Sequence, residues 1–311
     1  MKKHRWGSWL GAIVSLCAGL YFIRAIASNW QSFTLGQVGP HLFALMGGAL
    51  LLYLATYLAA TRAWQLGLRV MGEARSFAAL AGILMLSQFA KYLPGNIGHH
   101  VGRVLLAQRA GLPMDITVAS LLLDMVLVVL AGVFCSLPAF ALLVEAARAH
   151  GAAAQRTVWL ALPLLAAVAL AVLALPAVRR RISPPLARLG AIRSMSGLSK
   201  IVQAWASHCL SFLLGASALY LLCRILPEAA LPSPGWLDVV GIYAAAWLLG
   251  FLMPGAPAGL GIRELVLLLG LSPLLGEQPA VTAAAALRLV TTVGDGVAFG
   301  AAASGLSRTT V

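Results

Sequence analysis

Residues 89–103 read FAKYLPGNIGHHVGR, and this stretch interrupts a long apolar run with a Pro-Gly break, three glycines, two histidines and two cations. Proline lacks a backbone N–H, so a helix that enters the stretch is expected to end at the Pro-Gly pair. Residues 251–264, FLMPGAPAGLGIRE, repeat the pattern far downstream. Both stretches run from an apolar segment through Pro-Gly to a glycine-spaced arginine, and the other segments of the chain can be interpreted as a scaffold around them.

The composition indicates a polytopic helical membrane protein. Of the 311 residues, 61% are hydrophobic and only 10% are charged. A soluble domain needs more charge on its surface, and several runs approach the roughly 20 apolar residues that span a bilayer. The short alternating strands of an outer-membrane barrel are absent from the sequence. The net charge of +13 lies mostly in short loops, which is typical of membrane orientation and argues against nucleic-acid binding.

Loop charges predict six membrane spans and two hairpins, with both termini in the cytoplasm. Lys2, Lys3 and Arg5 place the N-terminus inside, and Arg62, Arg69 and Arg75 are assigned to a cytoplasmic loop after the second span. We predict re-entrant hairpins at 77–110 and 236–275, because a broken helix at membrane depth must be covered by protein or water. Loop charge would equally allow both hairpins to cross fully. The spans are expected at about residues 9–26, 41–60, 116–144, 158–178, 201–225 and 280–305.

The order of these segments predicts two repeats of opposite topology. Residues 1–150 and 151–311 each contain two spans, a hairpin and a further span. The first half begins inside and the second begins outside, so the halves are inverted and their hairpins enter from opposite faces. Inverted repeats whose broken helices meet near the midplane are a transporter architecture.

Each hairpin break is a candidate anion site. The second leg begins inside the membrane, where its free N–H groups and helix dipole favour negative charge. Asn96 could cap the second leg of the first hairpin, and Lys91 lies in the last turn of the first leg. The alternative is that Pro-Gly only kinks a buried helix. The residues that break the helices are Pro94, Gly95, Gly98, Pro254, Gly255, Gly259 and Gly261.

Charged residues in apolar segments form the candidate site. Each would cost at least about 2.5–3.5 kcal/mol at the bilayer centre, so they should face a cavity or each other. Internal salt bridges are one interpretation, with Arg103 pairing with Asp124 and Arg288 with Asp295. Binding of a phosphate by the arginines is the other, since the guanidinium fork suits that group. The cations are Lys91, Arg103, Arg263 and Arg288, and the acids are Asp124, Glu264 and Asp295.

The sequence indicates neither a catalytic site nor a cofactor site. His99 and His100 are expected to point in different directions on a helix, with no carboxylate or cysteine at ligand spacing, so we expect no metal there. A headgroup contact or a polar lining suits His99 better. The chain contains no nucleophile elbow, no phosphate-binding loop and no paired carboxylates on one helix face.

These motifs resemble those of the lysylphosphatidylglycerol synthase transmembrane-domain family, also called the flippase-like domain family. The resemblance covers essentially the whole chain, and Arg288 falls where the family carries an arginine. It implies movement of aminoacylated phosphatidylglycerol or other polar lipids between leaflets. The soluble synthase domain that some members carry is not found in these 311 residues, so aminoacyl transfer is not expected. The motifs are KYLPG at 91–95, GR at 102–103, GLP at 111–113 and PAGLGIRE at 257–264.

We therefore expect a flippase of the bacterial cytoplasmic membrane that moves a phosphate-bearing lipid by alternating access. The lipid would be an anionic or zwitterionic phospholipid, or a polyprenyl-phosphate-linked lipid. Two alternatives are an integral-membrane lipid-modifying enzyme and a non-transporting partner of a separate synthase. The acids Asp124, Glu264 and Asp295 would orient the cations or bind a cationic headgroup. The expected headgroup contacts are Lys91, Tyr92, Asn96, His99, Arg103, Arg263 and Arg288.

Overall fold

The computed structural model describes residues 40–92, 98–149, 195–225, 234–253 and 257–309, with Leu20 and Arg24 as single residues. This part of the chain is helical and contains no strand. Three short 3₁₀ turns join or extend the helices: η3 (Phe89–Tyr92), η4 (Leu137–Ala139) and η6 (Pro257–Gly259). The α-helices are α2 (Pro40–Val70), α3 (Phe77–Gln88), α4 (Gly98–Arg109), α5 (Met114–Ser136), α6 (Phe140–Ala149), α9 (Met195–Leu222), α10 (Trp236–Leu252), α11 (Ile262–Leu275) and α12 (Glu277–Thr309).

Five helical segments among the described residues are long and apolar enough to cross a membrane. The structure therefore confirms an all-helical, multi-pass membrane protein. The span expected at 158–178 lies outside the described residues, and so does the span expected at 9–26 except for Leu20 and Arg24. The five segments are His41–Val70, Met114–Glu145, Met195–Leu222, Pro257–Leu275 and Glu277–Gly305.

The first described span is longer than predicted. Arg62 and Arg69 do not lie in a loop, because α2 continues through both to Val70. No proline stands in this stretch, and Trp64, which is fully buried, packs in a cluster with Leu68 and Leu80. Gly72, with φ of +85°, marks the turn that follows the helix.

The region of the first predicted hairpin contains α3, η3 and α4, so separate helices lie on the two sides of the predicted break. The side chain of Ser76 caps α3 by accepting a hydrogen bond from the N–H of Ala79 at 3.3 Å. Pro94, Gly95 and Asn96 lie outside the described residues. A Cβ on Gly98 would stand 2.4 Å from the carbonyl oxygen of Ala90, so the close approach of the two legs requires glycine there.

The second hairpin consists of α10, η6 and α11, and its tip holds an unusual backbone. Pro254 and Gly255 lie outside the described residues. Ala258, Gly259 and Gly261 all have positive φ, at 51°, 70° and 85°. Only glycine adopts this region without cost, so the Ala258 backbone is strained. The glycines of the PAGLG motif thus form the turn that starts α11.

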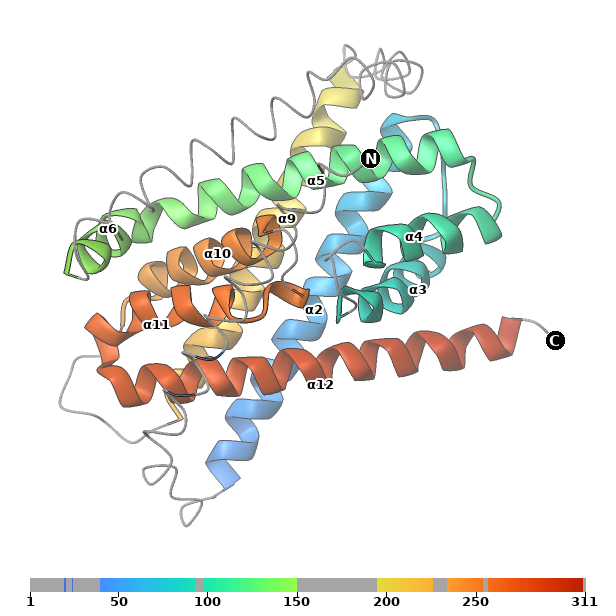
Figure 1. Ribbon diagram of the computed structural model, residues 1–311. Coiled ribbons are helices and arrows are strands. Elements are labelled where there is room, and N and C mark those ends of the chain that lie inside the picture. The colour runs from blue at the N-terminus through green and yellow to red at the C-terminus, as the bar shows by residue number, and fades with distance from the viewer. Residues whose placement is uncertain are drawn as a thin grey trace, which may run out of the picture.

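Figure 1 shows how the helices are arranged around these hairpins. α2 and α9 cross the molecule and pack against each other, while α5 and α12 run along opposite sides of it. The hairpins lie between those sides, α3–α4 toward one end and α10–α11 toward the other.

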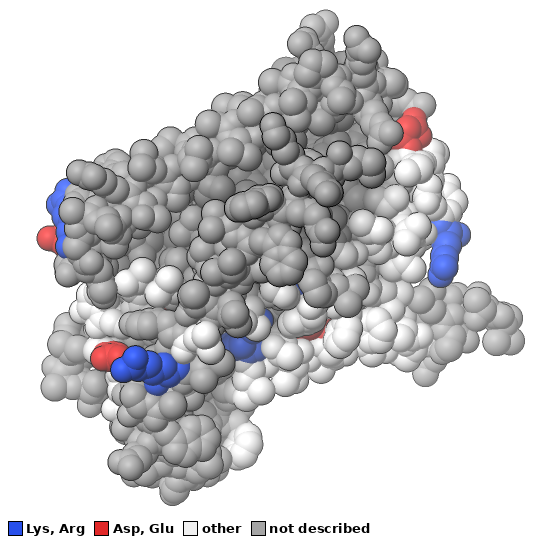
Figure 2. Space-filling view, in the orientation of Figure 1, with Lys and Arg blue, Asp and Glu red and all other residues white. Residues whose placement is uncertain are grey.

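The exterior suits a bilayer. Phe43 and Leu51 of α2 are 68% and 70% exposed, as expected for side chains that face lipid. Figure 2 shows charged side chains at only a few separate positions on the described part of one face. α10, in contrast, buries most of its length in the core, including Val239 and Ile242.

Candidate functional site

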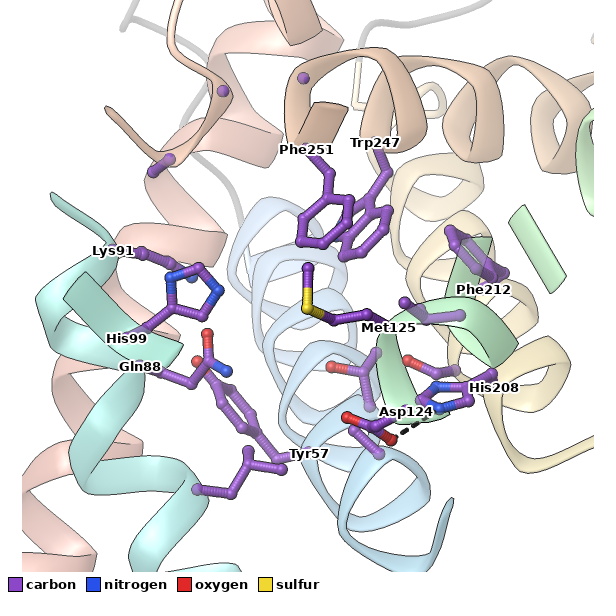
Figure 3. Close-up of a pocket in the computed structure, with 18 of the residues that line it drawn as sticks. Tyr57, Gln88, Lys91, His99, Asp124, Met125, His208, Phe212, Trp247 and Phe251 are labelled. Carbon is purple, nitrogen blue, oxygen red and sulfur yellow. Dashed lines mark hydrogen bonds and ion pairs between the residues drawn. The ribbon is translucent and has the colours of Figure 1, made fainter. Parts of the chain in front are cut away.

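A cavity of about 170 Å³ lies where the two hairpins meet α2, α5 and α9. Polar and apolar residues line different parts of it. Figure 3 shows Lys91 and His99 on one side, with the rings of Trp247 and Phe251 facing the space from α10. The charged residues on its wall are Lys91, Arg103, Asp124 and Arg263.

Asp295 of α12 is the centre of the first charged cluster. Its carboxylate is 2.7 Å from Nζ of Lys91, and the residue is only 2% exposed. Tyr53 donates a hydrogen bond to it at 2.6 Å, and Tyr57 and Tyr92 donate two more. Tyr53 and Tyr57 are four residues apart and therefore share one face of α2. The four donors satisfy a carboxylate that would otherwise be very costly to bury.

Asp124 of α5 is the centre of the second cluster. Nη1 of Arg103 is 2.9 Å from one carboxylate oxygen, which confirms the predicted pair. Nε2 of His208 lies 2.9 Å from the other oxygen, so α9 is joined to the same carboxylate (Figure 3). The guanidinium of Arg103 also lies 5.1 Å from the ring centre of Trp64, within cation–π range.

The third pair joins α11 to α12. Nη1 of Arg288 lies 3.3 Å from Glu264, whose other oxygen accepts a hydrogen bond from the N–H of Gly261 at 2.7 Å. The same nitrogen donates at 3.5 Å to the carbonyl of Ala258, the strained residue. The predicted pairing of Arg288 with Asp295 is wrong. They are seven residues apart on one helix, roughly 10 Å along its axis at 1.5 Å per residue, and each meets a nearer partner from a hairpin.

Arg263 lines the cavity without a carboxylate partner. No acidic side chain in the described part of the chain lies within ion-pair distance of it, and it stands beside the buried ring of Tyr243. Two glycines make room for its stem: a Cβ on Gly250 would stand 2.4 Å from Cγ of Arg263, and one on Gly259 would stand 2.8 Å from Cδ. The hairpin glycines thus position this arginine at the wall.

His99 and His100 lie together rather than apart. Their ring centres are 3.9 Å from each other, so rotation about the side-chain bonds overcomes their different directions on α4. Nδ1 of each ring is buried with no hydrogen-bond partner among the described residues. Both rings line the cavity, and the described residues contain no group of three His, Cys, Asp or Glu placed to hold a metal.

Aromatic residues form the apolar wall. Trp247 and Phe251 stack with ring centres 4.9 Å apart, and Phe212 meets the edge of Trp247 at 5.2 Å. Met125 lies opposite them in Figure 3. Sequence reasoning missed this wall and also Tyr53, Tyr57 and His208. The i, i+4 spacing of the tyrosines and of Trp247 with Phe251 was the available signal.

The predicted headgroup residues thus divide into three groups. Lys91, His99 and Arg103 line the cavity with Arg263. Tyr92 and Arg288 are not among the residues that line it; they contact Asp295 and Glu264 respectively. Asn96 lies outside the described residues.

The fold and the cavity define a polytopic helical membrane protein. Its ion pairs lie between two helical hairpins, each of which is interrupted at a Pro-Gly motif. The chain belongs to the family described as lysylphosphatidylglycerol synthase TM region, whose model matches residues 8–298. No curated protein matched the sequence. Membership links the protein to a membrane-lipid function.

Proposed function

We propose that the protein is a lipid flippase that moves a phosphate-bearing polar lipid between leaflets by alternating access. The observation that carries this proposal is the cavity between the hairpins, with three cations and several aromatic side chains on its wall. The headgroup would occupy the cavity while the tails stay in the bilayer. No residue in it is assigned a catalytic role.

The chemistry of the wall supports a phosphate ligand. An arginine presents a planar fork of donors that binds two phosphate oxygens, and such charge-assisted bonds are the strong ones in a dry site. Arg103 and Arg263 come from the second legs of different hairpins, so one headgroup between them would contact both halves. Cations are expensive at membrane depth and are typically retained there for a function.

The packing of the helices supports the two inverted repeats. α5 packs against α10 as α12 packs against α3, and α5 packs against α9 as α12 packs against α2. In this proposal one half is therefore related to the other by three exchanges: α2 with α9, α3–α4 with α10–α11, and α5 with α12. In Figure 1 α5 and α12 run in opposite directions, as an inversion requires.

The ion pairs follow the same correspondence with their signs exchanged. In the first half Arg103 on the hairpin pairs with Asp124 on α5, and in the second half Glu264 on the hairpin pairs with Arg288 on α12. Each pair joins the second leg of a hairpin to the last helix of its own half. Rocking of one half against the other, with these pairs moving as units, would expose the cavity to each leaflet in turn.

A leaflet-flip assay in reconstituted vesicles tests the proposal. Fluorescent phosphatidylglycerol in the inner leaflet should become accessible to dithionite at a rate that depends on the protein. Arg103→Ala and Arg263→Ala should slow this rate, whereas Arg109→Ala, an exposed arginine at the end of α4, should leave it unchanged. Variants that fold and flip at the parent rate would refute the site.

The same vesicles separate the alternatives. A lipid-modifying enzyme would change the mass of lipid extracted after incubation, and a flippase would not. A non-transporting partner of a synthase would give no flipping of any lipid.

A further inference from the structure

The charges in and around the cavity do not balance. Three acids and four cations gather there, and each acid is held by one cation at 3.3 Å or less. The fourth cation, Arg263, has no carboxylate partner among the described residues. The neighbouring histidines can only add positive charge. The three pairs are Lys91–Asp295, Arg103–Asp124 and Arg288–Glu264.

The acids are not available to a ligand. Asp295 accepts four donors from the protein, and Asp124 has one cation or imidazole on each oxygen. Glu264 accepts from the backbone of its own helix start and from Arg288. A cationic headgroup would have to displace one of these partners and leave it buried and unpaired, which is costly.

Donors for an anion are, in contrast, left over at the wall. Besides Arg263, Nε of the 5%-exposed Arg103 is buried and has no hydrogen-bond partner among the described residues. The same holds for Nδ1 of His99, which is 7% exposed. These three side chains come from both hairpins and all line the cavity. A phosphodiester supplies one negative charge and several acceptor oxygens, which would complete the charge balance.

The size of the cavity restricts the rest of the headgroup. Its volume of about 170 Å³ is close to the roughly 150 Å³ of an engineered cavity that admits benzene. A phosphate with a small substituent fits this scale better than an oligosaccharide does. Trp247 and Phe251 stack on one another, so only the outer face of each ring is open to an ammonium group.

We propose that the ligand is a lipid with a small, singly anionic phosphodiester headgroup, such as phosphatidylglycerol, and that Arg263 selects it against aminoacylated, cationic forms. This inference rests on the proposed flippase function and specifies its substrate. Arg263, which has no carboxylate partner among the described residues, would bind the phosphate. Each acid of the described site is already held by a cation, so a lysyl or other ammonium group would be excluded.

Comparing the flipping rates of three labelled lipids in the same assay tests this selectivity. Vesicles of phosphatidylcholine would carry trace fluorescent phosphatidylglycerol, phosphatidylethanolamine or lysyl-phosphatidylglycerol. Phosphatidylglycerol should flip roughly tenfold faster than either of the others, since an unpartnered buried charge costs more than the 1.4 kcal/mol that this ratio represents. Equal rates, or a faster lysyl lipid, would overturn the selectivity while leaving the flippase function intact. No flipping of any lipid would refute the function itself.

Variants at Arg263 test whether this side chain causes the preference for phosphatidylglycerol. Arg263→Gln should remove the preference for phosphatidylglycerol, and Arg263→Lys, which keeps the charge without the fork, should retain part of it. Arg109→Gln removes an exposed arginine from α4 and should keep the full preference. An unchanged preference in a folded Arg263→Gln protein would contradict the assignment.

Two further measurements do not depend on a variant's folding. Mass spectrometry of lipid co-purified with the unaltered protein should find anionic phospholipid enriched over the membrane extract, and enrichment of cationic or zwitterionic lipid would overturn the proposal. Inorganic phosphate should bind the purified protein much more weakly than short-chain phosphatidylglycerol. Equal affinities would identify a free anion as the occupant.

Discussion

Asp295 shows how single residues make a charged site possible inside the membrane. Its carboxylate is shielded from lipid. It forms an ion pair with Lys91 and accepts hydrogen bonds from three tyrosine hydroxyls. Removing its charge leaves the Lys91 ammonium buried without its counter-ion. Broken buried pairs of this kind cost several kcal/mol, whereas exposed pairs contribute little.

We therefore expect Asp295→Asn to lower the free energy of unfolding by about 3–5 kcal/mol, the range measured for broken buried pairs. The control is Glu73→Gln, which removes a more exposed ion pair with Arg75 at 3.7 Å and should cost at most ~1 kcal/mol. Denaturant unfolding in detergent micelles measures both. Similar losses in the two variants would mean that Asp295 is not held as described.

The sequence could predict the charged residues of the site but not all their partners. Lys91, Arg103 and Asp124 were recognisable because charge in an apolar span is costly. Tyr53 and His208 were not, because tyrosine and histidine carry no fixed charge and so do not stand out within an apolar span. The partner of Arg288 depends on how far α11 is shifted along the axis of α12. A single sequence does not specify this shift.

A double-mutant cycle distinguishes the observed pairing from the predicted one. Glu264 and Arg288 are in contact, so their substitutions by glutamine should show a coupling energy of about 0.5–3 kcal/mol. Arg288 and Asp295 share no contact, and their substitutions should add to within about 0.5 kcal/mol. The free energy of unfolding of the single and double variants gives both values. The reverse result would restore the Arg288–Asp295 pair.

At the scale of elements, glycines determine how closely the helices approach the site. A Cβ on Gly294 of α12 would stand 2.5 Å from the ring of Tyr53, the tyrosine that donates to Asp295. A Cβ on Gly296, two residues further, meets nothing within 4 Å. The two positions therefore differ in packing, although both are glycines on the same helix.

Gly294→Ala should accordingly displace Tyr53 and lower stability by about 1–3 kcal/mol, the usual cost of overpacking. Gly296→Ala should be neutral or raise stability by up to ~1 kcal/mol, because alanine favours a helix. Thermal unfolding of the two purified variants is the measurement. If Gly294→Ala is as stable as Gly296→Ala, the close contact between α2 and α12 is not present.

The elements themselves were largely predictable, and their ends were not. Breaks at the Pro-Gly motifs follow from the missing N–H of proline, and the structure places separate helices on each side of both. The extension of α2 to Val70 depended on burial of Trp64 and Leu68 in a tertiary cluster, which loop charge does not report.

At the scale of the whole molecule, the proposed inverted repeat predicts a relation between two residues that neither composition nor local packing predicts. Asp115 stands at the start of α5 and Glu277 at the start of α12, and both are exposed. Under the proposed exchange of α5 with α12 these positions are equivalent, so an inversion would place them on opposite faces of the membrane. Two parallel repeats would place them on the same face.

Cysteine labelling can decide between these arrangements. With the four native cysteines replaced by alanine, Asp115→Cys should react with a membrane-impermeant maleimide only from the cytoplasm, and Glu277→Cys only from the opposite side. The loop charges predict this assignment, because Arg109 precedes α5 whereas no Lys or Arg lies within ten residues of Glu277. Intact and inverted vesicles provide the two sides. If both cysteines react from one side, the halves are not inverted, and alternating access would need a different structural basis from two matched hairpins.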